Sequence, residues 1–233
     1  RIVRIERKKF LVQELFDNVS HRYDLMNDFM SLGFHRLWKK RLINSLDAVE
    51  PSMILDLAGG TGDISLLLSK KFPCSSIIIY DLSFEMMLNS KKKITNKNIS
   101  LINGSAEQLS IADNSIDLIT LSFGLRNFSN LKKSISECYR VLRYGGKLYC
   151  LEFSPSYDAY IKTAYDFYSD KIIPKIGKFV AKNEEAYKYL VESIRNFPQN
   201  SELKNIFNKA GFFCYNDIRL MGGIAILNIF SKV

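Results

Sequence analysis

The chain has 233 residues, of which 47% are hydrophobic and 24% charged, so it should fold as a globular protein and not stay disordered. The longest apolar runs, such as Ile77–Tyr80 and Ile116–Leu121, are far shorter than the roughly 20 residues of a membrane helix. Lys and Arg exceed Asp and Glu by 33 to 24. This surplus leaves three interpretations open: a solvated surface, a patch facing an anionic membrane, or binding of nucleic acid.

The first 50 residues carry no strand signal and are predicted to be helical and partly amphipathic. Arg1–Phe10 is charged and lacks a long apolar stretch, so we expect no cleavable signal. With neither a membrane span nor a signal, the simplest expected location is the cytoplasmic side of a membrane.

From residue 51 to residue 156, short apolar runs alternate with helical stretches. The runs are rich in β-branched or aromatic residues and apolar enough to be buried on both faces, as strands of a parallel sheet are. Leu131–Leu142 predicts a helix with one apolar face, which Tyr144–Gly146 should end. The alternation predicts a doubly wound, mostly parallel sheet, an α/β fold. The predicted strands are Met53–Leu57, Ile77–Tyr80, Ile99–Asn103, Ile116–Phe123 and Lys147–Phe153.

The last third of the chain returns to helical patterns before two final strands. Residues 157–210 are aromatic-rich and helical, and Phe212–Leu220 and Ile224–Ser231 read as strands around Gly222-Gly223. A two-glycine connection favours a hairpin, so the last strand should run antiparallel to the others. We therefore expect a single domain over 1–233: a helical cap (1–50), a core (51–156), a helical lid (157–210) and a final hairpin (211–233).

The four cysteines are spaced too widely for the common metal or disulfide patterns. None forms a C-x-x-C pair, and two lie in apolar runs. We expect them to be reduced and structural, with no metal site and no disulfide framework. They are Cys74, Cys138, Cys150 and Cys214.

The strongest local signal is the glycine-rich segment Asp56–Asp63, placed where the first strand should turn into a helix. Its glycines, Gly59, Gly60 and Gly62, allow a tight turn and a close approach to a ligand. The G-G-x-G spacing differs from the G-x-G-x-x-G of dinucleotide sites, and carboxylates at both ends would repel a pyrophosphate. They suit a ligand with a positive ammonium or sulfonium, such as S-adenosylmethionine. The alternative is a tight turn without a ligand.

Asp81 ends the second predicted strand, where an acid accepts hydrogen bonds from ribose hydroxyls in nucleotide-binding sheets. Its alternative role is to cap the following helix. Ser105-Ala106 follows the third strand, at the rim where an adenine would lie. Ser122 lies at the rim around the fourth strand.

At this point the chain resembles the class I S-adenosylmethionine-dependent methyltransferases, and more narrowly the ubiquinone/menaquinone biosynthesis C-methyltransferases of the UbiE type. Two long signatures of that family are matched, and the similarity covers nearly the whole chain. The resemblance implies a seven-stranded Rossmann-like sheet with an antiparallel last strand, and S-adenosylmethionine as cofactor. The matching segments are Tyr23–Trp38, Asp56–Asp63, Asp81, Ser122–Asn127, Arg140–Ser154, Tyr187–Arg195 and Ala210–Phe212.

The chain departs from the family pattern at two places. Arg143–Gly146 replaces Lys-Pro-Gly-Gly, which should change only a turn, and Ser105 replaces an asparagine at the adenine rim. A serine hydroxyl can still hydrogen-bond there. Together, the glycine loop and the resemblance assign the cofactor to Asp56, Gly59, Gly60, Thr61, Gly62, Asp81, Leu82, Ser105, Ala106 and Ser122.

The implied reaction transfers a methyl group from the sulfonium to a ring carbon of a polyprenylated hydroquinone. Arg126 would stabilise the phenolate, and Asn127 would orient the same oxygen. His35 and Tyr23 are the candidate proton acceptors. Two alternatives stay open: Arg126 as a structural ion-pair partner, and His35 and Tyr23 as packing residues that hold the N-terminal helices over the cofactor.

The helical lid suggests how such a substrate would be reached. Its aromatics could line a channel for the polyprenyl tail, and its lysines could touch anionic lipid, although an ordinary amphipathic layer explains the same pattern. We expect peripheral association with the inner face of a membrane, no nucleic acid partner, and a homodimer or a quinone-synthesis complex as possible assemblies. The lysines are Lys162, Lys171, Lys175, Lys178 and Lys182.

Other functions compete with this interpretation. Within enzymes, the same fold could act on a sterol, another small phenol or lipid, or an RNA base. A dehydrogenase or nucleotide-binding module is disfavoured by the G-G-x-G spacing and the final hairpin. A non-catalytic scaffold of a quinone-synthesis complex is disfavoured by the retained Thr61, Asp81 and Arg126.

Overall fold

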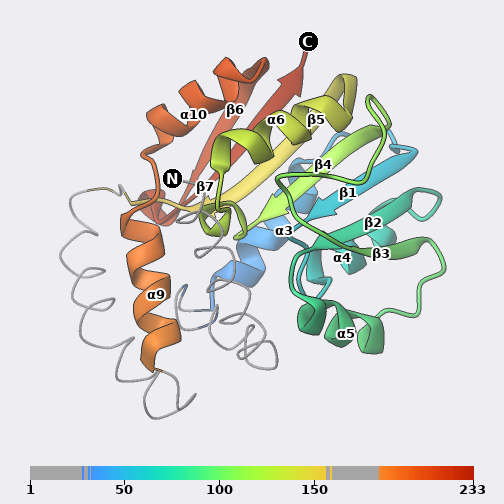
Figure 1. Ribbon diagram of the computed structural model, residues 1–233, viewed down its shortest axis with the longest axis horizontal. Coiled ribbons are helices and arrows are strands. Elements are labelled where there is room, and N and C mark those ends of the chain that lie inside the picture. The colour runs from blue at the N-terminus through green and yellow to red at the C-terminus, as the bar shows by residue number, and fades with distance from the viewer. Residues whose placement is uncertain (1–27, 29–30, 32, 156–157, 159–183) are drawn as a thin grey trace.

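A computed structural model describes residues 28, 31, 33–155, 158 and 184–233. In this part of the chain, strands form a seven-stranded sheet in the order β3-β2-β1-β4-β5-β7-β6, with helices on both faces (Figure 1). The strands are β1 (Met53–Leu57), β2 (Ser76–Asp81), β3 (Ile99–Asn103), β4 (Ile116–Ser122), β5 (Leu142–Phe153), β6 (Phe212–Leu220) and β7 (Ala225–Lys232). The helices are α3 (His35–Ser45), α4 (Asp63–Lys71), α5 (Phe84–Lys93), α6 (Leu131–Val141), α9 (Glu184–Arg195) and α10 (Asn200–Lys209), with short 3₁₀ turns η2 (Leu125–Asn127) and η5 (Met221–Gly223).

The strand directions confirm the predicted fold class. β3, β2, β1, β4 and β5 pair in parallel, whereas β7 pairs antiparallel with both β5 and β6. The predicted hairpin turns through η5, where Gly222 and Gly223 have φ of 63° and 92°, in the left-handed region that glycine tolerates. The last strand is therefore inserted between its neighbours.

β5 begins earlier than predicted. It starts at Leu142 rather than Lys147, and its pairing with β4 shifts between Ile116 and Leu118. Gly145 has φ of 78° within this irregular stretch. The glycines predicted to end the helix therefore form a bulge inside the strand, and α6 itself ends at Val141.

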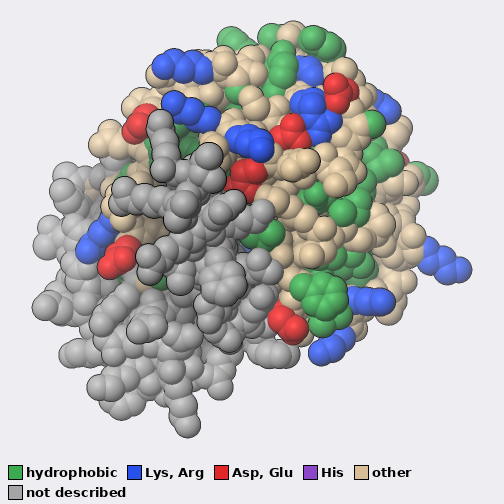
Figure 2. Space-filling model, in the orientation of Figure 1, with side chains coloured by type: hydrophobic (Ala, Val, Ile, Leu, Met, Phe, Trp, Pro, Cys, Tyr) green, Lys and Arg blue, Asp and Glu red, His purple; other side chains and the backbone are tan. Residues whose placement is uncertain are grey.

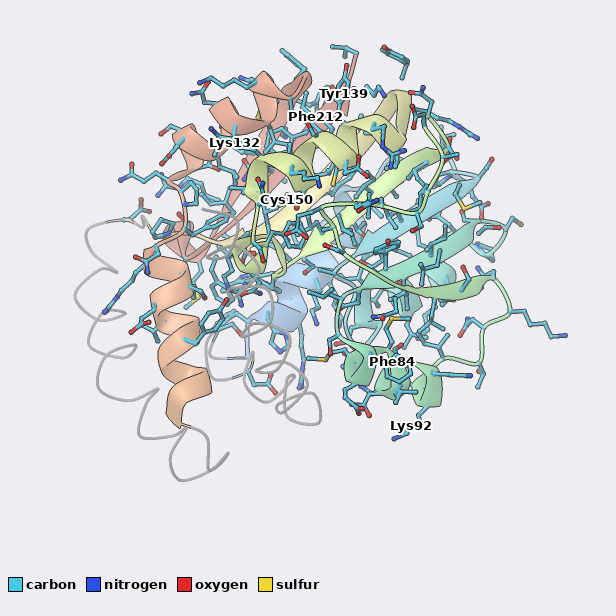
Figure 3. All side chains as sticks on the ribbon, viewed as in Figure 1. Phe84, Lys92, Lys132, Tyr139, Cys150 and Phe212 are labelled. Atoms are coloured by element: carbon cyan, nitrogen blue, oxygen red, sulfur yellow. The ribbon has the colours of Figure 1, made fainter. Side chains whose placement is uncertain are left out.

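Successive side chains of each central strand point to opposite faces of the sheet, because the strand is pleated. Ile54 packs with α3 and α4 on one face, and Leu55 packs with α6 and α10 on the other. On the second face the rings of Phe207 and Phe230 stack at 3.8 Å. Tyr139 of α6 meets Phe212 of β6 edge-on at 5.2 Å (Figure 3). The central strands are thus buried on both faces, which explains why they are mostly apolar.

The cysteines in the described part are free thiols, and two of them are buried. Burial raises the pKa of Cys138 to about 12, so its thiol stays protonated and packs as a small apolar group. Among the described residues, no three side chains of His, Cys, Asp or Glu are grouped so that they could hold a metal ion.

No helix among the described residues combines the length and the apolar character that crossing a bilayer demands.

Candidate functional site

A cleft opens at the carboxyl ends of β1, β2, β3 and β4. The strand order reverses between β1 and β4, which is where open α/β sheets bind ligands. Its empty volume is about 720 Å³, part of it open to solvent. It is lined by Leu57, Ala58, Gly60, Tyr80, Asp81, Leu82, Ser83, Met86, Gly104, Ala106, Glu107, Phe123, Gly124, Asn127, Phe128 and Ser129.

The glycine loop turns sharply from β1 into α4. Gly60 and Gly62 have φ of 54° and 81°, and Gly62 is the residue that caps α4. A Cβ at Gly62 would lie 2.6 Å from Ile94 Cδ1, the end of a side chain that can shift, so the left-handed backbone angle is the main reason for glycine here. Gly59 accepts a hydrogen bond from Gly62 N at 2.9 Å, which closes the turn. This geometry explains the predicted G-G-x-G spacing.

Asp81 joins two of the cleft walls. Its Oδ2 accepts a hydrogen bond from Gly60 N at 2.9 Å, and its Oδ1 accepts one from Ser83 N at 2.8 Å. The cap of α5 is Ser83, whose Oγ accepts from Met86 N at 3.2 Å, so the capping role considered for Asp81 belongs to Ser83. A carboxylate offers about four acceptor positions, so these two bonds leave its geometry compatible with ligand hydroxyls.

Asp56 lies beneath the glycine loop and not among the residues that line the cleft. It is 1% exposed and accepts hydrogen bonds from Ser65 Oγ at 2.6 Å and from Thr120 Oγ1 at 2.9 Å. Burial raises the pKa of this carboxyl to about 6, against the opposing effect of the two hydroxyls. Its contribution in this structure is to hold β1, β4 and α4 together under the loop.

The rims after β3 and β4 are tied to each other. Ala106 lines the cleft, whereas the Ser105 hydroxyl donates to Glu107 Oε2. Glu107 Oε1 accepts from Ser129 N at 3.0 Å, across the cleft edge. Ser122 Oγ is buried and has no hydrogen-bond partner in the described part, so a ligand that reached it would satisfy an otherwise unpaired hydroxyl.

Arg126 forms a buried ion pair that periodicity alone could not reveal. Its NH1 donates to Glu152 Oε1 at 2.6 Å and to the Phe123 carbonyl at 2.7 Å. Glu152 also accepts from the Arg126 backbone N at 3.2 Å, and the guanidinium lies 5.4 Å from the centre of the Phe153 ring. These contacts are those of the structural ion-pair partner that was the alternative in the sequence analysis, and stabilisation of a phenolate by Arg126 stays a prediction. It lines a second cavity that shares Phe128 and Ser129 with the cleft.

Asn127 lines the cleft and is held from outside by α9. The Tyr189 hydroxyl donates to Asn127 Oδ1 at 3.2 Å. With Oδ1 engaged, the Asn127 Nδ2 is the end of the amide that remains to donate to a ligand. Tyr189 lies within Tyr187–Arg195, the stretch that the resemblance matched, but its spacing gave no sign of a partner 62 residues away.

His35 lies in the packing of the N-terminal region and not on the cleft. It is 1% exposed, and its Nε2 lies 2.8 Å from Asp28 Oδ1. Burial lowers the pKa of His35, partly offset by the hydrogen bond with Asp28. Its role as a proton acceptor stays a prediction, and Tyr23 lies outside the described residues.

Lys39 fastens α3 to the glycine loop, a contact that the sequence did not suggest. The buried Lys39 Nζ lies 3.0 Å from Asp63 Oδ2. Thr61, also buried, points its hydroxyl toward Asp63 Oδ1 at 3.5 Å. Asp63 is therefore neutralised by Lys39 instead of facing the cleft as a bare carboxylate.

The structure thus sorts the predicted site residues into two groups, apart from His35, which does not line the cleft, and Tyr23, which lies outside the described residues. Gly60, Asp81, Leu82, Ala106 and Asn127 line the cleft. Residues that shape its walls from behind or within the loops are Asp56, Gly59, Thr61, Gly62, Ser105, Ser122 and Arg126.

Comparison with known proteins agrees with this geometry. The ubiE/COQ5 methyltransferase family matches residues 3–232. This chain belongs to that family. A ubiquinone/menaquinone biosynthesis C-methyltransferase UbiE of Rickettsia typhi is 42% identical over 97% of this chain and 94% of its own length. The UbiE protein of Blochmanniella floridana is 43% identical over 97% of this chain and 91% of its own length.

Solved structures of lower identity share the fold. A SAM-dependent methyltransferase from Aquifex aeolicus has a TM-score of 0.62 at 17% identity, covering 84% of this chain and 89% of its own. A SAM-dependent methyltransferase of Thermotoga maritima, a possible histamine N-methyltransferase, has a TM-score of 0.69 at 16% identity over 95% of this chain and 100% of its own. As a family member, the chain is an S-adenosylmethionine-dependent methyltransferase.

The residues that line the cleft are chemically suited to this cofactor. Apolar walls from Tyr80, Leu82 and Ala106 suit a flat adenine, and the Asp81 carboxylate has acceptor oxygens of the kind that ribose hydroxyls need. Gly104 must stay small, because a Cβ there would collide with the Tyr80 ring. The unpaired Ser122 hydroxyl adds a polar group at the neighbouring rim.

The first prediction concerns Asp56. Its pKa is raised from 3.8 to about 6, so the folded protein binds this proton more tightly than the unfolded chain does. The stability that this group contributes is complete below about pH 4 and is lost as the pH rises through about 6. Relative to Asp56→Asn, the wild type should lose up to about 3 kcal/mol of unfolding free energy across that interval, measured by urea denaturation at each pH. A difference that stays constant with pH would contradict the assignment.

The second prediction concerns the Arg126–Glu152 pair. Arg126→Met should lower the unfolding free energy by about 3–5 kcal/mol, because Glu152 is left buried without its cation. Arg126→Met/Glu152→Gln should recover part of this loss, since the neutral glutamine leaves no unpaired buried charge and keeps one acceptor oxygen for one of the two backbone N–H groups that Glu152 binds. Urea denaturation of the two single variants and the double variant measures the coupling. Strictly additive losses would show that the two side chains do not stabilise each other.

Proposed function

We propose that this methyltransferase transfers a methyl group to a ring carbon of a polyprenylated hydroquinone in ubiquinone and/or menaquinone synthesis. The names of its relatives support this substrate class. The observation that carries the proposal is the position of Asn127, which lines the cofactor cleft and has its amide fixed by Tyr189. A fixed amide donor at the cleft is what a phenolic oxygen needs.

S-adenosylmethionine, when bound, supplies a methyl group on a sulfonium, which is a good leaving group. The residues that would hold it are the glycine loop, Asp81 at the ribose, and Leu82 and Ala106 at the adenine. What remains for the chain is to align the ring carbon and to raise its electron density. A phenol resembling tyrosine has a pKa of about 10, so stabilising its anion makes the ring more nucleophilic.

Asn127 is the residue we assign to the phenolic oxygen. Its Nδ2 would donate to that oxygen, while the Tyr189 hydroxyl donates to the Oδ1 of the same amide. The Arg126 guanidinium would act at longer range, because Glu152 shares its charge. This division revises the role given to Arg126 in the sequence analysis: it shapes the 3₁₀ turn that presents Asn127. His35 and Tyr23 stay predicted proton acceptors.

We also propose a peripheral location at the inner face of a membrane, because a polyprenylated substrate resides in the bilayer. The lid lysines named in the sequence analysis lie outside the described residues. We further propose that the protein works as a homodimer or within a quinone-synthesis complex. The alternative is methylation of another small phenol or lipid on the same cleft.

The third prediction tests the cofactor site. Asp81→Ala should weaken binding of S-adenosylhomocysteine about 10- to 100-fold, because hydrogen bonds to a charged acceptor contribute about 1.5–3 kcal/mol. Calorimetric titration measures the affinity, with NADH as a ligand that should not bind. Asp117→Ala is the control, since Asp117 also accepts a backbone N–H, from Met53, at the other end of the sheet. Equal affinities of wild type and Asp81→Ala would defeat the assignment.

The fourth prediction tests the reaction. Wild-type protein should methylate short-chain quinols, and Asn127→Ala should lower kcat about 100-fold while leaving S-adenosylhomocysteine affinity near the wild-type value. Tyr189→Phe should lower kcat less, because the amide is still present but no longer fixed. Tyr144→Phe, at an exposed tyrosine, is the matched control.

Each outcome of this assay has a defined meaning. Cofactor binding without methylation of any quinol would favour another substrate or a scaffold. Unchanged kcat in both Asn127→Ala and Tyr189→Phe would remove Asn127 from the mechanism. Loss of cofactor affinity in Asn127→Ala would assign the amide to the cofactor instead of the quinol.

A further inference from the structure

Helix α5 carries apolar side chains on two faces, although only one of them faces the core. Met86 and Met87 are buried, at 2% and 8% exposed, together with Ser90. Phe84 and Leu88, one helical turn apart, are 54% and 37% exposed. A surface helix normally turns polar residues outward, so the outer pair requires an explanation.

Basic residues continue the same stripe. Lys91 and Lys92 lie seven and eight positions after Phe84, are exposed, and make no ion pair with the described residues. We call Phe84, Leu88, Lys91 and Lys92 the α5 outer face. Phe84 and Lys92 lie at the same end of the molecule in Figure 3, away from Lys132. Figure 2 shows hydrophobic and basic side chains together over this region.

The α5 outer face borders the cofactor cleft. Ser83, which caps α5, and Met86 in its first turn both line the cleft, so Phe84 lies between two lining residues in the chain. The N-terminal end of the outer face therefore lies next to residues that line the cleft. The same helix is tied to the glycine loop through Asp81, which binds both Ser83 N and Gly60 N.

We propose that the α5 outer face docks on an anionic lipid bilayer. Phe84 and Leu88 enter the boundary between head groups and acyl chains, and Lys91 and Lys92 contact lipid phosphates. This inference rests on the proposed function, since it places the cleft mouth against the bilayer that holds a polyprenylated substrate. The residues that contact lipid in this inference belong to α5, and not to the lid that carries the lysines named earlier.

The chemistry of the face favours lipid over other partners. Lysines beside an aromatic and an aliphatic side chain, on one stripe of a helix, are typical of interfacial membrane binding. A nucleic acid would be bound mainly through the lysines, and this would not explain why Leu88 is exposed beside them. The formal charge of +9 adds a general attraction to an anionic surface. Glu85, the acidic residue of the first turn, lies near the helix N-terminus, where the helix dipole favours it.

Co-sedimentation of the full chain with lipid vesicles tests the proposal. Vesicles of phosphatidylcholine with phosphatidylglycerol should bind the wild type, and vesicles of phosphatidylcholine alone should bind it more weakly. Phe84→Ser/Leu88→Ser and Lys91→Gln/Lys92→Gln should each weaken binding to the mixed vesicles about tenfold or more. Circular dichroism confirms that each variant is folded.

Matched variants elsewhere control for general loss of hydrophobicity or charge. Phe213→Ser removes an aromatic that is 56% exposed on β6, and Lys132→Gln/Lys133→Gln removes two exposed lysines on α6. Both should bind like the wild type. Wild-type binding by the α5 variants, an equal loss in the controls, or no binding of the wild type to mixed vesicles would each overturn the proposal. A dimer in size-exclusion chromatography that Phe84→Ser/Leu88→Ser dissociates would assign the face to a second copy and overturn it too.

Turnover of a water-soluble short-chain quinol separates this inference from the proposed function. All four variants should keep wild-type turnover on that substrate, because none changes the cleft. Quinol turnover together with unaltered vesicle binding by the α5 variants overturns the docking inference alone. Absence of quinol turnover in the wild type overturns the proposed function, whatever the vesicles show.

Discussion

The cleft depends on one topological constraint: β1 and β4 lie side by side, and the chain leaves them in different directions. After β1 it turns into α4, and after β4 it turns through η2 toward α6 on the other face of the sheet. Both exits need unusual backbone, since Ala58 and Phe123 have φ of 53° and 59°. Such conformations persist only when the surroundings fix them. Here Ala58 N donates to the Tyr80 carbonyl, and Phe123 N donates to the Leu151 carbonyl.

Polar side chains, most of them buried, hold this strained region from several sides. Glu152 fixes the turn that carries Arg126 and Asn127, and Asp56 binds hydroxyls from α4 and β4. Lys39 neutralises Asp63 from α3. Each of these carboxylates contacts a group on another helix, strand or turn. The walls of the cleft are therefore held by directional polar contacts, which apolar packing does not provide. The site is therefore preorganised before any ligand enters.

The features predicted correctly from the sequence are those that depend on residues close together in the chain. The β1, β3 and β6 boundaries match the predicted ranges. β1 and β3 are short runs rich in apolar residues, and β6 ends where the Gly222-Gly223 connection begins. The glycine loop and Asp81 were found from residue type at a strand end. The pairs Arg126–Glu152, Tyr189–Asn127 and Lys39–Asp63 were not found. They join residues 26, 62 and 24 positions apart, and periodicity carries no information on such contacts. The burial of Asp56 was missed for the same reason.

The placement of β7 has a consequence for how the protein is made. β7 follows both of its neighbours in the chain, yet it lies between β5 and β6. Until the ribosome has released it, β5 keeps one edge unpaired and β6 has no partner in the sheet. An open strand edge invites pairing with another chain. This half of the sheet therefore closes only after synthesis has passed residue 232, and the β5 edge stays unpaired from the time that β5 forms until then.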